Sequence, residues 1–151
     1  MAVTFIDYKE NKGFYIHEDF MQLAFIFIYA ELRIPNKYNF INKEDLISDC
    51  ESKVNGVHSG YFVLSWEKDL VGESEEQLMI ELLQSIINEL NSKGELIKAF
   101  ELESMETEDT HWKRIMDKPI PVKELIRIFN ALIEMLNDDW NSTNYNMDID
   151  W

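Results

Sequence analysis

Four stretches of the chain repeat apolar residues at the three- to four-residue spacing of a helix. Residues 18–33 are apolar almost all round, which predicts a central helix that Pro35 prevents from continuing. Residues 42–54, 74–93 and 121–136 each carry one apolar stripe opposite polar residues. The pattern therefore predicts one buried helix and three amphipathic ones.

Shorter apolar segments predict strands. Residues 3–5 and 14–16 flank the polar segment 9–13, which ends in glycine and indicates a hairpin turn. Residues 61–66 have the strongest strand pattern in the chain, because they are rich in aromatic and β-branched residues. Residues 96–102 have a weaker strand pattern, since their apolar positions fit neither period clearly.

These elements predict a single α+β domain over residues 1–151, with about four helices packed on a small, mainly antiparallel sheet. A mostly helical bundle with a peripheral hairpin is the alternative. A further short helix is expected from Trp112 to Met116, before Pro119. The polar residues 138–151 are expected to form an acidic, partly mobile tail.

Composition suits one folded domain, since 46% of the 151 residues are apolar and 13% are aromatic. Cys50 is the single cysteine, which excludes an internal disulfide and favours a reducing, cytoplasmic location. The first residues lack the basic start and apolar run of a secretory signal. The longest apolar stretch, 23–30, is far shorter than the roughly 20 residues that cross a bilayer, so no membrane association is expected.

Net charge is the most informative property of the composition. The chain has 29 acidic and 14 basic residues, a net charge of -15, which repels nucleic acid, so direct DNA or RNA binding is not expected. Residues 73–109 hold eleven acids and two bases, and residues 138–151 hold four acids and no base. Most of the excess negative charge therefore lies in two segments.

No motif in the chain predicts catalysis, a metal or a cofactor. His17, His58 and His111 are far apart and match no zinc-ligand spacing. Cys50 lies between two acids that oppose thiolate formation, so a core role is expected. The five glycines form no phosphate-binding pattern, and acids are too abundant to single out a hydrolase pair. We expect a protein that is not an enzyme.

The acidic segments also contain large aromatic residues, which predicts a surface that docks on a basic protein. Complementary charge accelerates association, and aromatic anchors slow dissociation. Improved solubility is the simpler explanation of the same charge. The predicted contact residues are Glu101, Glu103, Glu106, Glu108, Asp109 and Trp112.

A short, acidic, aromatic-rich α+β chain with one cysteine, no catalytic motif and no export signal resembles the immunity proteins of bacterial toxin–immunity systems. These systems include contact-dependent growth inhibition and polymorphic toxins. The resemblance covers the character of the whole chain. It implies a cytoplasmic protein that binds and neutralises a cognate toxin domain, which would be basic, for example a nuclease.

Two other functional classes stay open. A nucleic-acid mimic would occupy the DNA site of another protein through spaced carboxylates. A small hydrolase or ligand-binding domain would use His58 or His111 in an aromatic pocket. The partner's identity and the oligomeric state follow from none of these patterns.

Overall fold

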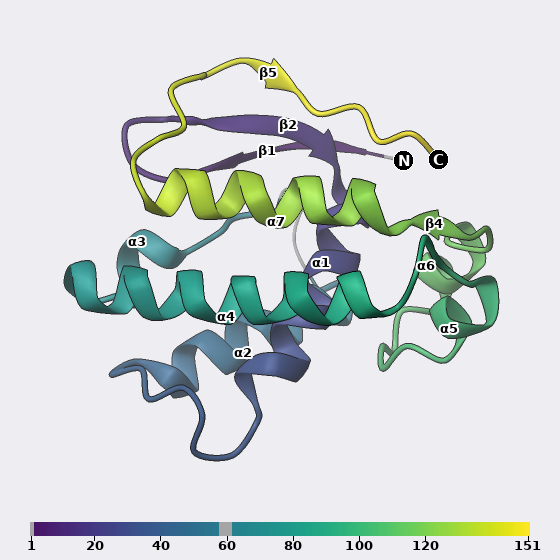
Figure 1. Cartoon of the computed structure of the whole chain (residues 1–151), viewed down its shortest axis with the longest axis horizontal. Helices are drawn as coiled ribbons and strands as arrows, with labels where there is room; N and C mark the ends of the chain where they lie inside the picture. Colours follow the sequence, from purple (N-terminus) through teal and green to yellow (C-terminus); the bar gives the residue numbers. More distant parts are fainter. Residues whose placement is uncertain (1, 58–61) are drawn as a thin grey trace.

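The chain folds into long and short helices that pack with short strands (Figure 1). The computed structural model describes residues 2–57 and 62–151. Their elements are β1 (Val3–Asp7), β2 (Gly13–His17), α1 (Glu18–Leu32), α2 (Lys43–Val54), α3 (Trp66–Asp69), α4 (Gly72–Ser92), β3 (Leu96–Ile97), α5 (Ala99–Glu103), α6 (Thr110–Ile115), β4 (Ile120–Pro121), α7 (Val122–Leu136) and β5 (Tyr145–Asn146). The predicted α+β class is confirmed.

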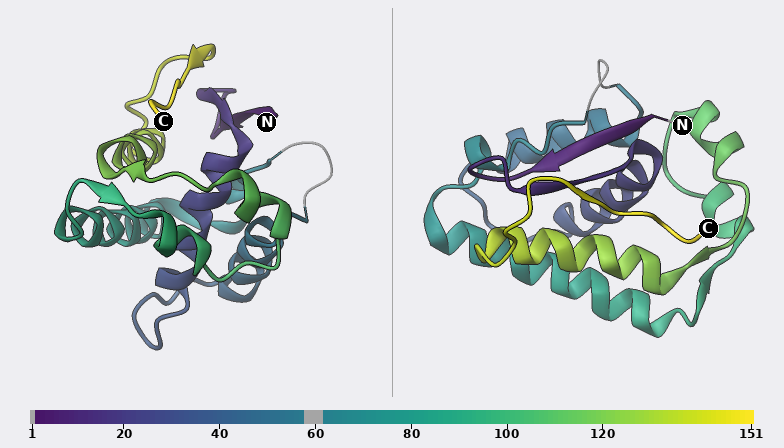
Figure 2. Two further views of the ribbon diagram at one scale, coloured as in Figure 1. Left: turned by 90° about the vertical axis from the view of Figure 1, so that its right-hand side faces the viewer. Right: turned by 90° about the horizontal axis from the view of Figure 1, so that it is seen from above.

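The four predicted long helices are present as α1, α2, α4 and α7. Helix α1 is buried on most sides and contacts the other three, which confirms its predicted central position. Helices α4 and α7 pack side by side (Figures 1 and 2). They do so because each has a single apolar stripe to bury. Helix α2 packs mainly against α1.

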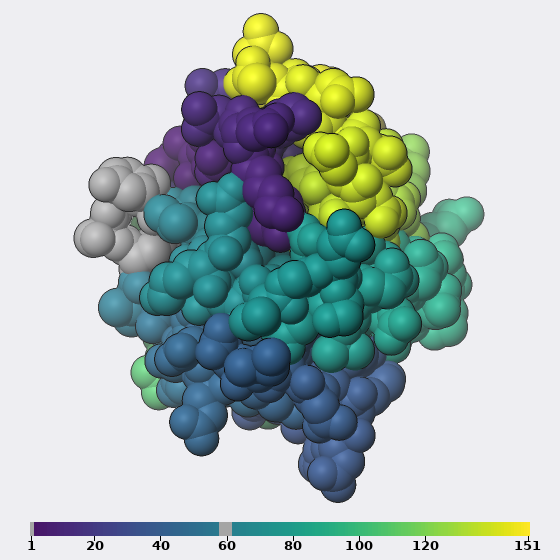
Figure 3. Space-filling model, turned by 90° about the vertical axis from the view of Figure 1, so that its left-hand side faces the viewer, coloured from purple at the N-terminus to yellow at the C-terminus, as the bar shows by residue number. Residues whose placement is uncertain are grey.

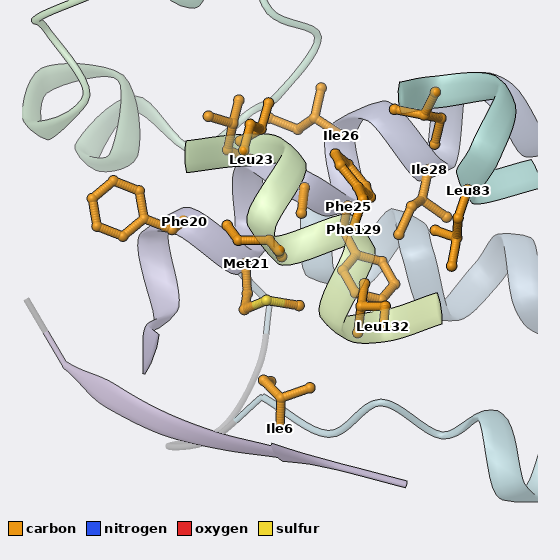
Figure 4. Close-up of a cluster of buried hydrophobic side chains, with 14 of the residues drawn as sticks. Ile6, Phe20, Met21, Leu23, Phe25, Ile26, Ile28, Leu83, Phe129 and Leu132 are labelled. Atoms are coloured by element: carbon orange, nitrogen blue, oxygen red, sulfur yellow. The ribbon is translucent and has the colours of Figure 1, made fainter. Parts of the chain in front are cut away.

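The core lies where α1 meets α4 and α7 (Figure 4). Phe25 and Ile28 come from α1, and their side chains are fully buried. Leu83 from α4 and Phe129 and Leu132 from α7 are equally buried. Burying each such side chain stabilises the fold by roughly 1.5–3 kcal/mol, so this junction fixes how the helices are placed.

The predicted hairpin is formed by β1 and β2, which pair antiparallel with Phe5 opposite Tyr15. Lys9, Glu10 and Asn11 make the turn in the left-handed region, with φ of 48°, 59° and 58°. Strand β5 adds to β2 in parallel, and β3 and β4 form a separate antiparallel pair. The sheets are therefore small and mainly antiparallel, as predicted.

The hairpin turn is held against α4. The hydroxyl of Tyr8 donates to Glu76 Oε2 at 2.6 Å, and Lys9 Nζ donates to the same oxygen at 3.1 Å. Burial, followed by the hydrogen bond to Glu76 and its negative charge, raises the pKa of Tyr8. Figure 3 shows the turn, in purple, between α4 in teal and the C-terminal segment in yellow.

The strand predicted at residues 61–66 is wrong for all of it that is described; residue 61 lies outside the described residues. Phe62 and Leu64 are buried and the residue between them is exposed, which is the alternation of a strand. The Phe62 N–H, however, donates to the side-chain oxygen of Thr4, at 3.1 Å. Ser65 then turns into the left-handed region, φ 64°, and α3 begins.

The strand predicted at residues 96–102 is correct only at its start. Ile97 is buried and pairs with Ile120 in the β3–β4 ladder. The Glu101 carboxylate then accepts a hydrogen bond from the Lys98 N–H at 3.4 Å. This contact is typical of a helix start, so the remaining residues form α5.

Residues 138–151 lie along β2 and α7 (yellow in Figures 1 and 2). The Trp140 indole N–H donates to the Gly13 carbonyl at 2.9 Å. The Trp151 indole N–H donates to the Lys118 carbonyl at 3.2 Å. Both tryptophans therefore tie this acidic segment to the rest of the fold.

Candidate partner-binding surface

The six predicted contact residues lie at one end of the molecule, on α5, on α6 and in the loop that joins them (Figures 1 and 2). Glu103, Glu106 and Glu108 are exposed. Glu101 and Asp109 are half-buried, and Trp112 is buried. The fold brings all six into one region, but only Glu103, Glu106 and Glu108 are exposed to solvent.

Asp109 and Trp112 have structural contacts instead. Asp109 caps α6, because its Oδ1 accepts from the Trp112 backbone N–H at 3.0 Å. Its Oδ2 accepts from Gln22 Nε2, also at 3.0 Å. The Trp112 side chain is 1% exposed, and its indole N–H donates to the Asp19 carbonyl at 3.0 Å. These two residues anchor α6 to α1.

The loop that carries the exposed acids is fastened to the end of α2. The Thr107 hydroxyl donates to the Val54 carbonyl at 2.6 Å. The Glu108 N–H donates to Asn55 Oδ1 at 2.9 Å. The loop therefore presents the carboxylates of Glu106 and Glu108 from a fixed backbone, which lowers the entropy lost when a partner binds.

A groove of about 350 Å³ lies beside Glu101 and Glu106, between the second half of α1, the end of α4 and α5. Ile26, Phe27 and Met105 give its lining an apolar part. Its charged lining residues are Glu31, Arg33, Glu89, Lys93, Glu101 and Glu106. Two of the predicted contact acids thus border a concave, partly apolar surface.

Two ion pairs lie on the groove rim. Arg33 Nη2 is 3.2 Å from Glu106 Oε2, and Lys93 Nζ is 3.8 Å from Glu101 Oε2. The Arg33 guanidinium also lies 3.8 Å from the ring centroid of Tyr29. Because the Glu106 side chain is 84% exposed, its ion pair adds little to stability.

Glu31 is the one buried carboxylate in the groove lining. It accepts hydrogen bonds from Lys37 Nζ at 2.7 Å, from the Tyr38 hydroxyl at 2.6 Å and from Ser85 Oγ at 3.2 Å. Burial alone would raise the pKa of Glu31, but the hydrogen bonds from Lys37 and Tyr38 lower it overall. The ionised carboxylate therefore joins α1 to the following loop and to α4.

Replacing Glu31 with glutamine should lower the urea midpoint of unfolding at pH 7. Since the folded-state pKa is lowered, the contribution of Glu31 is complete above its ordinary value near 4.5 and is lost as pH falls through the folded value. The difference from wild type should therefore shrink below pH 4.5. Glu89→Gln, an exposed acid on the same rim, is the control, and a difference for Glu31→Gln that stays constant down to pH 3 would contradict the assignment.

Sequence reasoning missed the groove residues Tyr29 and Arg33. The available signal was their spacing of four residues at the end of a predicted helix, because side chains at this spacing are neighbours on a helix surface. The position of Glu106 beside them depends on how the loop packs against α2, which no local pattern predicts. The groove itself appears only when α1, α4 and α5 are assembled.

Cys50 and the two described histidines, His17 and His111, do not form a reactive cluster. Burial raises the pKa of the Cys50 thiol to about 12, which suits the core role predicted for it. His17 and His111 are exposed, and His58 lies outside the described residues. Within residues 2–57 and 62–151, no three histidine, cysteine or acidic residues are placed to hold a metal ion.

Among the described residues, no helix is both long enough and apolar enough to cross a bilayer. Comparison with protein-family models, with curated proteins and with solved structures gives no match.

Proposed function

We propose that this protein is an immunity-type inhibitor, which binds a basic toxin domain and neutralises it in the cytoplasm by stoichiometric association. The observation that carries the proposal is a partly apolar groove whose lining includes Glu106, on the same helix and loop that carry the exposed acids Glu103 and Glu108. Glu103, Glu106 and Glu108 supply the charge, and Ile26 and Phe27 contribute apolar surface.

The two parts of this surface act on different steps of binding. The net charge of -15 attracts a basic partner over long distances and orients it, which raises the association rate. The apolar groove acts after contact, because burying a partner side chain there removes apolar surface from water and slows dissociation. Together they suit fast capture and slow release of a basic protein.

A charge-reversal experiment tests the proposal. The candidate partner to be tested is the product of the neighbouring upstream gene, and co-purification with this chain tests whether the two proteins form a complex. Replacing Glu103, Glu106 and Glu108 with lysine should slow association about tenfold or more at low salt, and the difference should fade at high salt. Stopped-flow fluorescence measures the rate.

The matched control reverses three exposed acids elsewhere, Glu44 and Glu51 on α2 and Glu134 on α7. It changes the net charge equally but leaves the groove surface intact, so its effect on association should be clearly smaller. Equal rates for the two triple variants would show that another face binds the partner. The absence of a toxin-like neighbour and of any basic partner would refute the immunity function.

A further inference from the structure

A guanidinium group already occupies part of the groove rim. Arg33 follows the last residue of α1, and its guanidinium stacks at 3.8 Å over Tyr29. Its Nη2 donates to Glu106 Oε2 at 3.2 Å, and its Nε donates to the Tyr29 carbonyl at 3.3 Å. The chain's own arginine thus shows which chemical group an aromatic face and a carboxylate hold at this point.

We propose that Tyr29 and Glu106 form an arginine-binding site, and that Arg33 is an internal placeholder which an arginine of the basic partner displaces. This inference rests on the proposed function, because it names the chemistry that the same surface recognises. The partner's guanidinium would stack on Tyr29 and pair with Glu106. A neighbouring apolar side chain of the partner would enter the groove beside Ile26 and Phe27.

Exchange of one arginine for another costs little. The Arg33 side chain is 40% exposed, and an ion pair this open to solvent is weak. Arg33 can swing out to water on its long side chain, while the hydrogen bonds of Thr107 and Glu108 hold the loop that carries Glu106. The apparent affinity of such a site equals its intrinsic affinity multiplied by the fraction of time that Arg33 leaves it free, so removing Arg33 should strengthen binding.

The geometry favours arginine over lysine. A planar guanidinium stacks on an aromatic ring and at the same time presents several N–H groups to a carboxylate, whereas an ammonium is a strongly hydrated point charge. The other ion pair on the rim, between Lys93 and Glu101, has the longer distance of 3.8 Å and no ring contact. Selectivity for arginine should therefore depend on Tyr29 and Glu106.

The test is calorimetric titration of the full chain with hexa-arginine and hexa-lysine peptides. Arg33→Ala should tighten hexa-arginine binding about threefold to tenfold and hexa-lysine binding clearly less. Adding Tyr29→Leu or Glu106→Gln to Arg33→Ala should remove that gain. Arg114→Ala is the matched control, because it deletes an exposed arginine outside the groove lining and changes the net charge equally.

An equal gain for Arg33→Ala and Arg114→Ala, or equal gains for the two peptides, would overturn the arginine site. Thermal melts by circular dichroism confirm that each variant is folded before titration. Failure of the proposed function can be distinguished from failure of the arginine site, because the titration with peptides needs no toxin. Selective arginine binding with no toxin partner supports this inference alone. A captured toxin whose affinity is unaffected by both Arg33→Ala and Glu106→Gln supports only the proposed function.

Discussion

Replacing Gly13 with alanine is expected to destabilise the protein by about 3 kcal/mol or more. A Cβ at this position would lie 1.8 Å from the Ile6 carbonyl oxygen and 2.7 Å from Asp7 Cα. Both are backbone atoms of β1, so no side-chain rotation relieves the overlap and the hairpin must separate. The Gly13 carbonyl also accepts the Trp140 indole N–H, so the displaced backbone would disturb the C-terminal segment as well.

Gly72→Ala is the control, because it tests the cost of a positive φ without any steric overlap. Gly72 has φ of +74°, but a Cβ there has no neighbour within 4 Å, so only the conformational cost of about 1–2 kcal/mol is expected. Urea unfolding followed by circular dichroism compares the two variants. A loss for Gly13→Ala no larger than that for Gly72→Ala would show that β1 can move aside.

The helices and the hairpin could be predicted because their signals are local. Within one helix, the spacing of apolar residues determines which face is buried, as in α4 and α7. Strand β5 had no such signal, because Tyr145 and Asn146 are exposed and pair with a strand at the other end of the chain. At Phe62 and Leu64 the error was the reverse, because a strand was predicted where none forms. Alternation shows which side chains are buried, and it is not specific to strands.

The candidate surface divides in the same way. The charge pattern located the exposed acids Glu103, Glu106 and Glu108, but charge along a chain carries no information on depth. Asp109 stands three residues before Trp112, which is the spacing of a helix cap, and this was a usable signal that both residues are structural. The contact between Arg33 and Glu106 depends on tertiary packing and has no local signature.

Replacing Trp112 with alanine is expected to cost about 3–5 kcal/mol, because a fully buried indole is lost and a cavity remains. Trp112→Phe keeps most of the volume but loses the hydrogen bond to the Asp19 carbonyl, so about 1–2 kcal/mol is expected. Urea unfolding measures both values. Stability changes within 0.5 kcal/mol of zero, the usual range for surface substitutions, would mean that Trp112 is not part of the core.

Comparing Phe100 with Trp112 tests which aromatic residue of this region binds a partner and which stabilises the fold. Phe100 lies on α5 with its side chain 66% exposed, so Phe100→Ala should leave stability nearly unchanged. If Phe100 anchors a bound partner, the same change should weaken the complex by about 2 kcal/mol, roughly thirtyfold in Kd. Trp112→Phe should leave the affinity almost unchanged when binding is measured under conditions in which the variant is fully folded. If Trp112→Phe weakened the complex and Phe100→Ala did not, α6 would have to move away from α1 on binding. A Trp112 side chain buried against α1 cannot contact a partner without that movement.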